Sequence, residues 1–290
     1  MSMNLIGNRL MKDITFGDRM KMYEKAESGR RFMPLLPVYA RIDGRSFSRF
    51  TKGFNRPYDE RMTKAMVETT KYLVNETNAL IGYTQSDEIS LAWYSDSIDS
   101  QIFFDGKIQK MVSVLAAMTS VKFNKCCQMT MLKTAADRLM PVFDCRVFQL
   151  PNKMEATNAL LWREQDATKN AISMAARSMF GHKQLMGKNG NEMQEMMWQE
   201  HGVNFNDYPD FFKRGTFVRR EPIWVDVKSL PEKEKPAKWE GVMPDQVQRH
   251  KVLELDMPKF STVTNRVEVI FDGADPIVEG LNEYIKRTNG

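Results

Sequence analysis

Two short stretches of the chain contain the residues best suited to chemistry. Residues 40–50 read Ala-Arg-Ile-Asp-Gly-Arg-Ser-Phe-Ser-Arg-Phe and carry Asp43, and residues 82–91 read Gly-Tyr-Thr-Gln-Ser-Asp-Glu-Ile-Ser-Leu and carry Asp87 and Glu88. In each stretch an apolar run typical of a strand leads to an acid at its end or in a tight turn. Acids at the ends of adjacent strands repel one another unless a cation lies between them, and hard oxygen ligands suit Mg²⁺. We therefore expect Asp43 and Asp87 to hold the pair of Mg²⁺ ions that nucleotidyl or phosphoryl transfer uses.

The residues that follow Asp43 are suited to binding phosphate. Gly44 has no side chain, so its carbonyl oxygen can approach a metal ion closely. The next residues form a loop whose backbone N–H groups can cradle phosphates, and Arg45, Ser46 and Ser48 add donors. The alternative interpretation is an ordinary Asp-Gly turn with a charged hairpin tip.

Glu88 allows two interpretations. In a regular strand its side chain points away from that of Asp87, because side chains alternate between the two faces of a sheet. In a tight turn it can support the site from behind the metal ligands. We expect Glu88 to act with the two aspartates as a catalytic group.

Apolar periodicity predicts the elements that position these acids. The order is strand, helix, strand, strand, helix, strand, over residues 36–42, 58–77, 80–83, 89–93, 102–126 and 142–150. This βαββαβ pattern is typical of an α+β fold in which an antiparallel sheet is backed by two helices. The first strand and the hairpin are neighbours in this arrangement, so Asp43 and Asp87 converge.

The remaining segments carry weaker signals. An N-terminal helix capped by Thr15 or Asp18 is expected before the first strand. Further helices are expected over residues 154–180, 191–201 and 276–287, strands over 215–227 and 267–271, and a mobile charged loop over 230–245.

Composition narrows the setting but not the function. The net charge of +5 permits an anionic partner such as RNA without requiring one. Three cysteines make no disulfide framework and no metal-ligand spacing, which favours a reducing, cytoplasmic setting. We expect no membrane association, because no stretch is apolar enough to span a bilayer.

Together these residues carry a family resemblance. The pair Arg41–Phe50 and Tyr83–Ser90 resembles the signature of the tRNA-histidine guanylyltransferase family and its "like" proteins, which are template-using 3′–5′ polymerases. Later blocks of the family occur in the same order, at 56–61, 143–147, 162–166 and 212–216. The resemblance implies a polymerase-palm-like catalytic domain with a helical extension over 34–228. It would follow an N-terminal helical segment (1–33) and precede a charged loop and C-terminal tail (229–290).

The resemblance also implies substrates and residue roles. ATP or GTP would activate an RNA 5′-monophosphate, and the 3′-hydroxyl of an incoming nucleotide, most often GTP, would attack it. Asp43, Gly44 and Asp87 would bind the metal ions. Nucleotide binding would involve Asp43, Gly44, Arg45, Ser46, Phe47, Ser48, Ser86, Asp87, Lys107 and Lys110. Contacts with tRNA or tRNA-like RNA would involve Asn170, Lys213 and Arg214. A homotetramer is expected.

One block departs from the family. Eukaryotic members carry His-Ile-Asn-Asn-Leu-Tyr-Asn where this chain has residues 168–174, and of these only Asn170 survives, with Thr168 at the histidine position. That block is associated with recognition of the histidine tRNA. Its loss favours template-dependent repair of RNA 5′ ends over strict maturation of that tRNA.

Two other functions fit the same acids. A nucleotidyl cyclase or nucleotide-binding phosphotransferase would use the metal ligands without RNA, although it does not need the blocks at 162–166 and 212–216. A non-catalytic RNA-binding module with a retired active site is the third hypothesis, and the presence of both acids counts against it.

Overall fold

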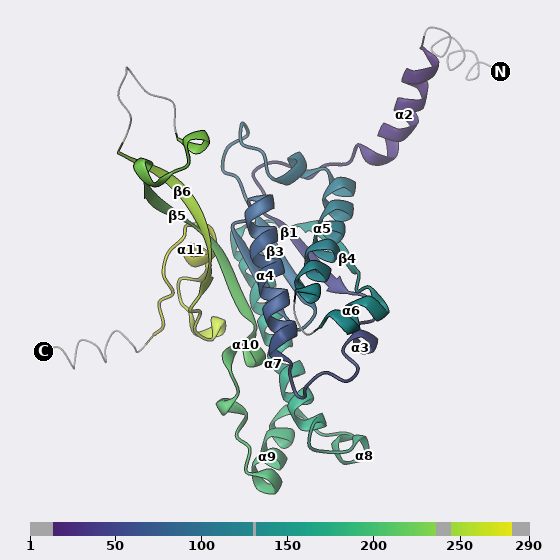
Figure 1. Cartoon of the computed structure of the whole chain (residues 1–290), viewed down its shortest axis with the longest axis vertical. Coiled ribbons are helices and arrows are strands. Elements are labelled where there is room, and N and C mark those ends of the chain that lie inside the picture. The colour runs from purple at the N-terminus through teal and green to yellow at the C-terminus, as the bar shows by residue number, and fades with distance from the viewer. Residues whose placement is uncertain (1–13, 130–131, 236–244, 280–290) are drawn as a thin grey trace, which may run out of the picture.

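The computed structural model describes residues 14–129, 132–235 and 245–279. Its centre is one antiparallel sheet with the strand order β4-β1-β3-β2-β5-β6 (Figure 1). The strands are β1 Val38–Gly44, β2 Ile81–Gln85, β3 Glu88–Trp93, β4 Phe143–Gln149, β5 Thr216–Asp226 and β6 Gln246–Leu255. The predicted βαββαβ sheet is therefore confirmed, and β5 and β6 extend it beyond β2.

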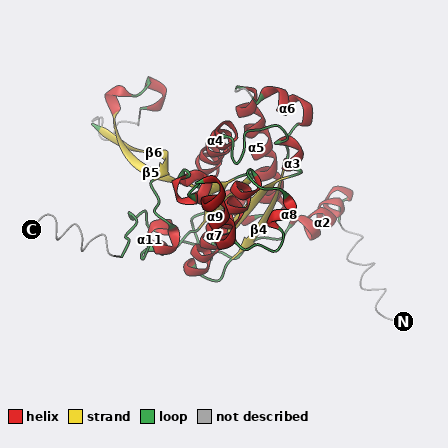
Figure 2. Ribbon diagram, turned by 90° about the horizontal axis from the view of Figure 1, so that it is seen from below, coloured by secondary structure: helices red, strands yellow, loops and turns green. Residues whose placement is uncertain are grey.

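Helices cover both faces of this sheet. The longer helices are α2 Phe16–Ser28, α4 Glu60–Thr77, α5 Ile108–Gln128, α7 Lys153–Arg177 and α9 Gly190–His201. The short helices are α3 Phe47–Phe50, α6 Lys133–Leu139, α8 His182–Leu185, α10 Asp210–Arg214 and α11 Arg266–Phe271. Figure 2 shows α4 and α5 on one side of the sheet and α7 on the other.

Strand alternation sorts the side chains of β1 onto these two faces. Val38, Ala40 and Ile42 are buried in the core shared with α4 and α5. Tyr39 belongs to a second core, which is shared with α7. Asp43 lies on the same face as Tyr39, so the predicted metal ligand is on the side of the sheet that α7 covers.

Local sequence explains where the helices begin. Asp59 caps α4 by accepting a hydrogen bond from the Arg61 N–H, and Asn152 caps α7 in the same way from Glu155. Thr15 caps α2, as one of the two predicted alternatives had it. The Asp59 cap fixes the start of α4 after β1 and the short helix α3.

One expectation for the C-terminal part was wrong, and one strand was not predicted. Residues 267–271 belong to helix α11 rather than to a strand. Strand β6 was not foreseen, because its sequence Gln-Val-Gln-Arg-His-Lys is mostly polar, and it is stabilised by pairing with the whole of β5. The predicted loop and the predicted last helix fall partly on residues 236–244 and 280–290, outside the described residues. Within the described part of the chain, none of the helices has the length and apolar character needed to cross a bilayer.

Candidate active site

The end of β1 meets the β2–β3 hairpin at the predicted acids. Asp43 pairs with Glu88 across the sheet, and the Gly44 N–H donates a hydrogen bond to the Asp87 carbonyl oxygen at 3.1 Å. Asp43 and Asp87 therefore come from backbones that are in direct contact, although they are distant in the sequence. The predicted convergence of these two strand ends is confirmed by this pairing.

The two carboxylates influence each other electrostatically. Burial, together with the negative charge of Asp43, raises the pKa of Asp87 to about 6. A divalent cation between the two groups would remove this penalty, and carboxylate and carbonyl oxygens are the ligands that Mg²⁺ prefers. Within residues 14–129, 132–235 and 245–279, no group of three or more Asp, Glu, His or Cys side chains could hold a metal ion. Asp43, Asp87 and the Gly44 carbonyl offer oxygen ligands of the kind that Mg²⁺ prefers, but they supply only two carboxylates.

Glu88 is held by two arginines. Its carboxylate accepts hydrogen bonds from Arg41 Nε at 2.8 Å and from Arg163 at 2.5 and 2.9 Å. The Glu88 side chain is only 13% exposed, and both of its oxygens are occupied by these guanidinium groups. Glu88 therefore holds Arg41 and Arg163, and Arg41 also lies beside Asp43. The catalytic role expected of Glu88 stays a prediction.

Arg41 and Arg163 belong to the site although neither was predicted to have a role in it. A guanidinium nitrogen of Arg41 lies 3.8 Å from Asp43 Oδ2, and Arg163 also forms an ion pair with Asp166 at 2.9 Å. The half-exposed indole of Trp162 packs over both guanidinium groups, at 5.8 and 4.4 Å from the ring centroid. The block at residues 162–166 could have indicated a role for Arg163, because it places this arginine and an acid one turn apart on α7.

The loop after Asp43 has one buried and several exposed residues. Arg45, Ser46 and Ser48 are exposed, as expected of donors to a ligand. Phe47 is buried and packs against other aromatic rings of the core, so only its backbone can take part in nucleotide binding. A Cβ atom added to Gly44 would lie 2.3 Å from the Phe47 ring, which explains why glycine occupies that position.

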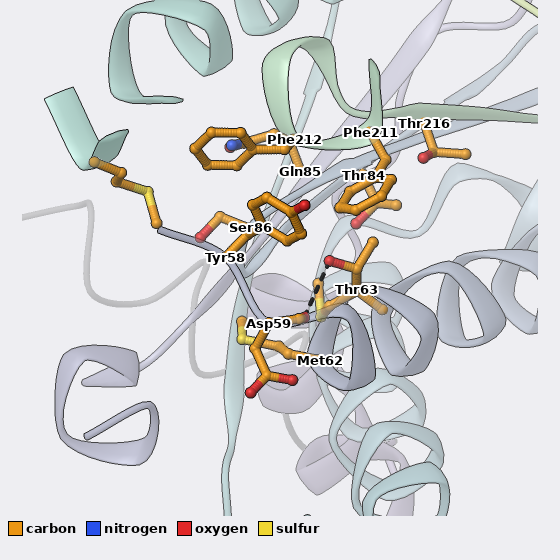
Figure 3. A pocket seen from close by; sticks show the side chains of 12 residues that line it. Tyr58, Asp59, Met62, Thr63, Thr84, Gln85, Ser86, Phe211, Phe212 and Thr216 are labelled. Atoms are coloured by element: carbon orange, nitrogen blue, oxygen red, sulfur yellow. Dashed lines mark hydrogen bonds between the residues drawn. The ribbon is translucent and has the colours of Figure 1, made fainter. Parts of the chain in front are cut away.

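The hairpin tip places Ser86 beside Asp87. Ser86 has a φ of 54°, in the left-handed region that non-glycine residues rarely adopt, and its hydroxyl donates to Asp87 Oδ1 at 3.1 Å. Behind the tip lies a small cavity of about 60 Å³, in which aromatic side chains of α10 face the hairpin (Figure 3). The cavity is lined by Tyr58, Asp59, Met62, Thr63, Met66, Thr84, Gln85, Ser86, Met174, Phe211, Phe212 and Thr216.

The residues expected to contact RNA lie near this cavity but differ in availability. The Lys213 ammonium donates to the Asn206 carbonyl at 2.6 Å and pairs with Asp210 at 3.1 Å. Arg214 also pairs with Asp210, at 2.7 Å. Asn170 is exposed on α7, one turn after Asp166. Asn170 is thus accessible, whereas the basic pair is already engaged within the fold.

Lys107 and Lys110 lie far from the carboxylates. Lys107 directly precedes α5 and forms an isolated β-bridge with Arg31, whereas Phe123, near the other end of α5, packs against Phe47. Because an α-helix rises 1.5 Å per residue, the two lysines lie about 20 Å from Phe123 along α5. α5 starts at the end of β3 remote from the hairpin, and the role of both lysines in nucleotide binding stays a prediction.

Known proteins share this sequence and fold. A family model described as tRNAHis guanylyltransferase matches residues 17–151. A bacterial tRNA(His) guanylyltransferase-like protein solved in complex with ATP has 39% sequence identity and a TM-score of 0.66, and the match covers 71% of this chain and 87% of that one.

Two further relatives have the same kind of name. A bacterial tRNA(His) guanylyltransferase-like protein in complex with GTP has 32% identity and a TM-score of 0.62, over 84% of this chain and 93% of that chain. The tRNA(His) guanylyltransferase of Schizosaccharomyces pombe is 28% identical over 221 residues, which are 70% of this chain and 80% of the relative. The paired aspartates, the palm-like sheet and these matches lead to one conclusion: the chain belongs to the tRNA(His) guanylyltransferase family of nucleotidyltransferases.

Proposed function

We propose that this chain adds nucleotides, preferably from GTP, to the 5′ end of tRNA or tRNA-like RNA in the 3′–5′ direction. The observation that carries the proposal is the contact between the ends of β1 and the hairpin, which brings Asp43 and Asp87 together beside an exposed loop. ATP-bound and GTP-bound relatives support nucleoside triphosphates as substrates.

The metal ions of this proposal are two Mg²⁺. Asp43, Asp87 and the Gly44 carbonyl would hold them, and the raised pKa of Asp87 supports a cation in this position. When bound, such ions neutralise triphosphate charge and activate an attacking hydroxyl.

The reaction proceeds in two displacements. An oxygen of the RNA 5′-monophosphate attacks the α-phosphorus of ATP, and pyrophosphate leaves. The 3′-hydroxyl of GTP then loses its proton and attacks the RNA 5′-phosphorus, so that a new phosphodiester forms and AMP leaves. Catalysis of this kind depends on positioning and charge stabilisation.

The residues of this chain supply the positioning. The backbone of residues 44–48, with Arg45, Ser46 and Ser48, orients the triphosphate. Glu88 holds Arg41 so that a guanidinium nitrogen lies 3.8 Å from Asp43 Oδ2.

Helix α7 bears on which RNA the protein prefers as its substrate. Thr168 occupies the position of the family histidine, and its hydroxyl donates back to the Glu164 carbonyl at 3.1 Å. A hydroxyl bonded to its own helix is poorly placed to read an RNA base. This favours template-dependent repair of several RNA 5′ ends over maturation of the histidine tRNA alone.

The proposal is tested with a 5′-truncated tRNA, labelled GTP, ATP and Mg²⁺. Wild-type protein should add the missing nucleotide, Asp87→Ala should not, and Asp96→Ala, which changes an exposed loop acid, should act as the wild type does. Truncated histidine tRNA and other truncated tRNAs should be extended at comparable rates. Failure of the wild-type protein to extend any of them, or full activity of Asp87→Ala, contradicts the proposal.

The assembly and location belong to the same proposal. We infer a homotetramer in the cytoplasm, on the basis of the family resemblance and the three free cysteines. Light scattering on the purified protein tests the assembly, and a monomer at micromolar concentration would contradict it.

A further inference from the structure

A second groove lies beside the nucleotide loop, on the side away from the hairpin. It has a volume of about 220 Å³ and runs between α3 and the segment that joins α6 to β4. Figure 1 shows α3 beside α6. Arg45 and Arg49 line it from the α3 side, and Met140 and Val142 line it from the other side. Arg45 also belongs to the loop that is proposed above to orient the triphosphate, whereas Arg49, Met140 and Val142 have no task in that function.

The charge of the groove is positive and unbalanced. The side chains of Arg45 and Arg49 are exposed, and no hydrogen bond or ion pair joins either guanidinium to another residue of the described part of the chain. No carboxylate lines the groove. Two unpaired guanidinium groups on one wall are suited to phosphate groups, which they can bind through two parallel hydrogen bonds.

The opposite wall is apolar and well fixed. Met140 is 72% exposed and Val142 is 44% exposed. The Arg45 N–H donates to the Val142 carbonyl at 2.9 Å, and the Asn124 amide donates to the Pro141 carbonyl at 2.7 Å. The apolar side chains are therefore presented by a backbone that is tied to its neighbours. Apolar contact surface beside cations is typical of sites for single-stranded nucleic acid, where bases lie on one side and the backbone on the other.

The groove begins directly at the catalytic site. Arg45 follows Gly44, and consecutive Cα atoms are about 3.8 Å apart, so a strand leaving the reacting end enters the groove within one or two nucleotides. In an RNA duplex whose 5′ end lies at Asp43 and Asp87, the 3′ end of the complementary strand lies beside that 5′ end. An unpaired 3′ extension therefore starts close to the groove.

We propose that this groove binds the unpaired 3′ extension of the RNA whose 5′ end reacts. The inference rests on the proposed function, since it takes RNA as the substrate. Arg49 contacts a phosphate of the extension, and Met140 contacts a base. Because neither wall offers a set of side chains that reads base edges, binding depends on an unpaired strand and not on its sequence.

The test compares two hairpin RNAs with a 5′-phosphate, one blunt and one with a four-nucleotide 3′ extension. Binding is measured by fluorescence anisotropy over a range of salt concentrations, without Mg²⁺ or nucleotide. The wild-type protein should bind the extended RNA more tightly. Arg49→Gln should lower the slope of log affinity against log salt by about 0.7 on the extended RNA, which is the value for one single-stranded phosphate contact, and leave the blunt RNA unchanged.

Two further variants sharpen the result. Met140→Ser should weaken binding of the extended RNA several-fold without changing the salt slope, because it removes no charge. Lys21→Ala, which removes an exposed cation on α2, should bind both RNAs as the wild type does. All three changes are at the surface, and equal melting temperatures confirm intact folding.

Several outcomes overturn the inference. These are equal binding of the two RNAs by the wild-type protein, equal loss on both RNAs in Arg49→Gln, and full competition by polyglutamate, which would indicate an acidic protein partner. The proposed function is tested separately, by nucleotide addition at saturating RNA. If the protein adds nucleotides but binds the extended and the blunt RNA equally well, only the inference about the groove is refuted.

Discussion

Replacing Asp87 by asparagine should stabilise the metal-free protein while it abolishes nucleotide transfer. The pKa of Asp87 is about 6, compared with an ordinary value of 3.8, because of burial and the charge of Asp43. A difference of about 2 pKa units corresponds to about 3 kcal/mol of unfavourable free energy for the charged form. Because the Asp87 side chain is only partly buried, we expect a gain of about 1–2 kcal/mol in the free energy of unfolding of Asp87→Asn at pH 7.5.

The sign of the pH dependence follows from the raised pKa. Between pH 4 and 6 the folded protein binds this proton more tightly than the unfolded chain does, so wild-type stability falls as the pH rises through this window. The advantage of Asp87→Asn should therefore vanish below about pH 4 and be complete above about pH 7. The assay is urea unfolding at several pH values in EDTA, with Asp96→Asn on an exposed loop as the matched control.

Mg²⁺ should reverse the order of stability. A cation that binds only the folded protein stabilises it by mass action, and Asp87→Asn has lost one ligand for it. Wild type should gain stability as the Mg²⁺ concentration rises, and the variant should gain less. A variant that is less stable than the wild type in EDTA, or a stability difference that does not change with pH, would refute the penalty that burial and the charge of Asp43 are inferred to place on the charged Asp87.

Three other substitutions test the packing around the site. Gly44→Ala should lower the free energy of unfolding by about 1–3 kcal/mol, since the new methyl group overlaps the Phe47 ring, and thermal melting measures this. Glu88→Gln should cost about 3 kcal/mol and reduce activity, because the buried Arg163 loses one of its two charged partners and keeps only Asp166, and unchanged melting would show that the ion pair with Glu88 contributes nothing. Asp59→Ala should cost about 2 kcal/mol near neutral pH. Hydrogen bonds from Arg61 lower the pKa of Asp59 to about 2, so this difference should shrink as the pH falls from about 5 toward 2, as urea unfolding at each pH can show.

Much of the fold and part of the site could be predicted from the sequence. The order of strands and helices follows from apolar periodicity, which reflects how often a strand or helix presents a side chain to a core. The meeting of Asp43 with the hairpin follows from that order, because βαββαβ units place the first and third strands side by side. The polar strand β6 escaped prediction because its pairing with β5, rather than its own apolar pattern, stabilises it.

The sequence by itself determined which acids stand at strand ends, which residues form the loop after Asp43, and which family motifs the chain carries. Only the tertiary structure decided that Glu88 holds Arg41 and Arg163, that Phe47 is in the core, and that Lys107 begins α5 at the end remote from the carboxylates. The physical reason is that periodicity and turn chemistry act over a few neighbouring residues. The partner of a charged side chain and the direction of a helix depend instead on which distant segments pack together.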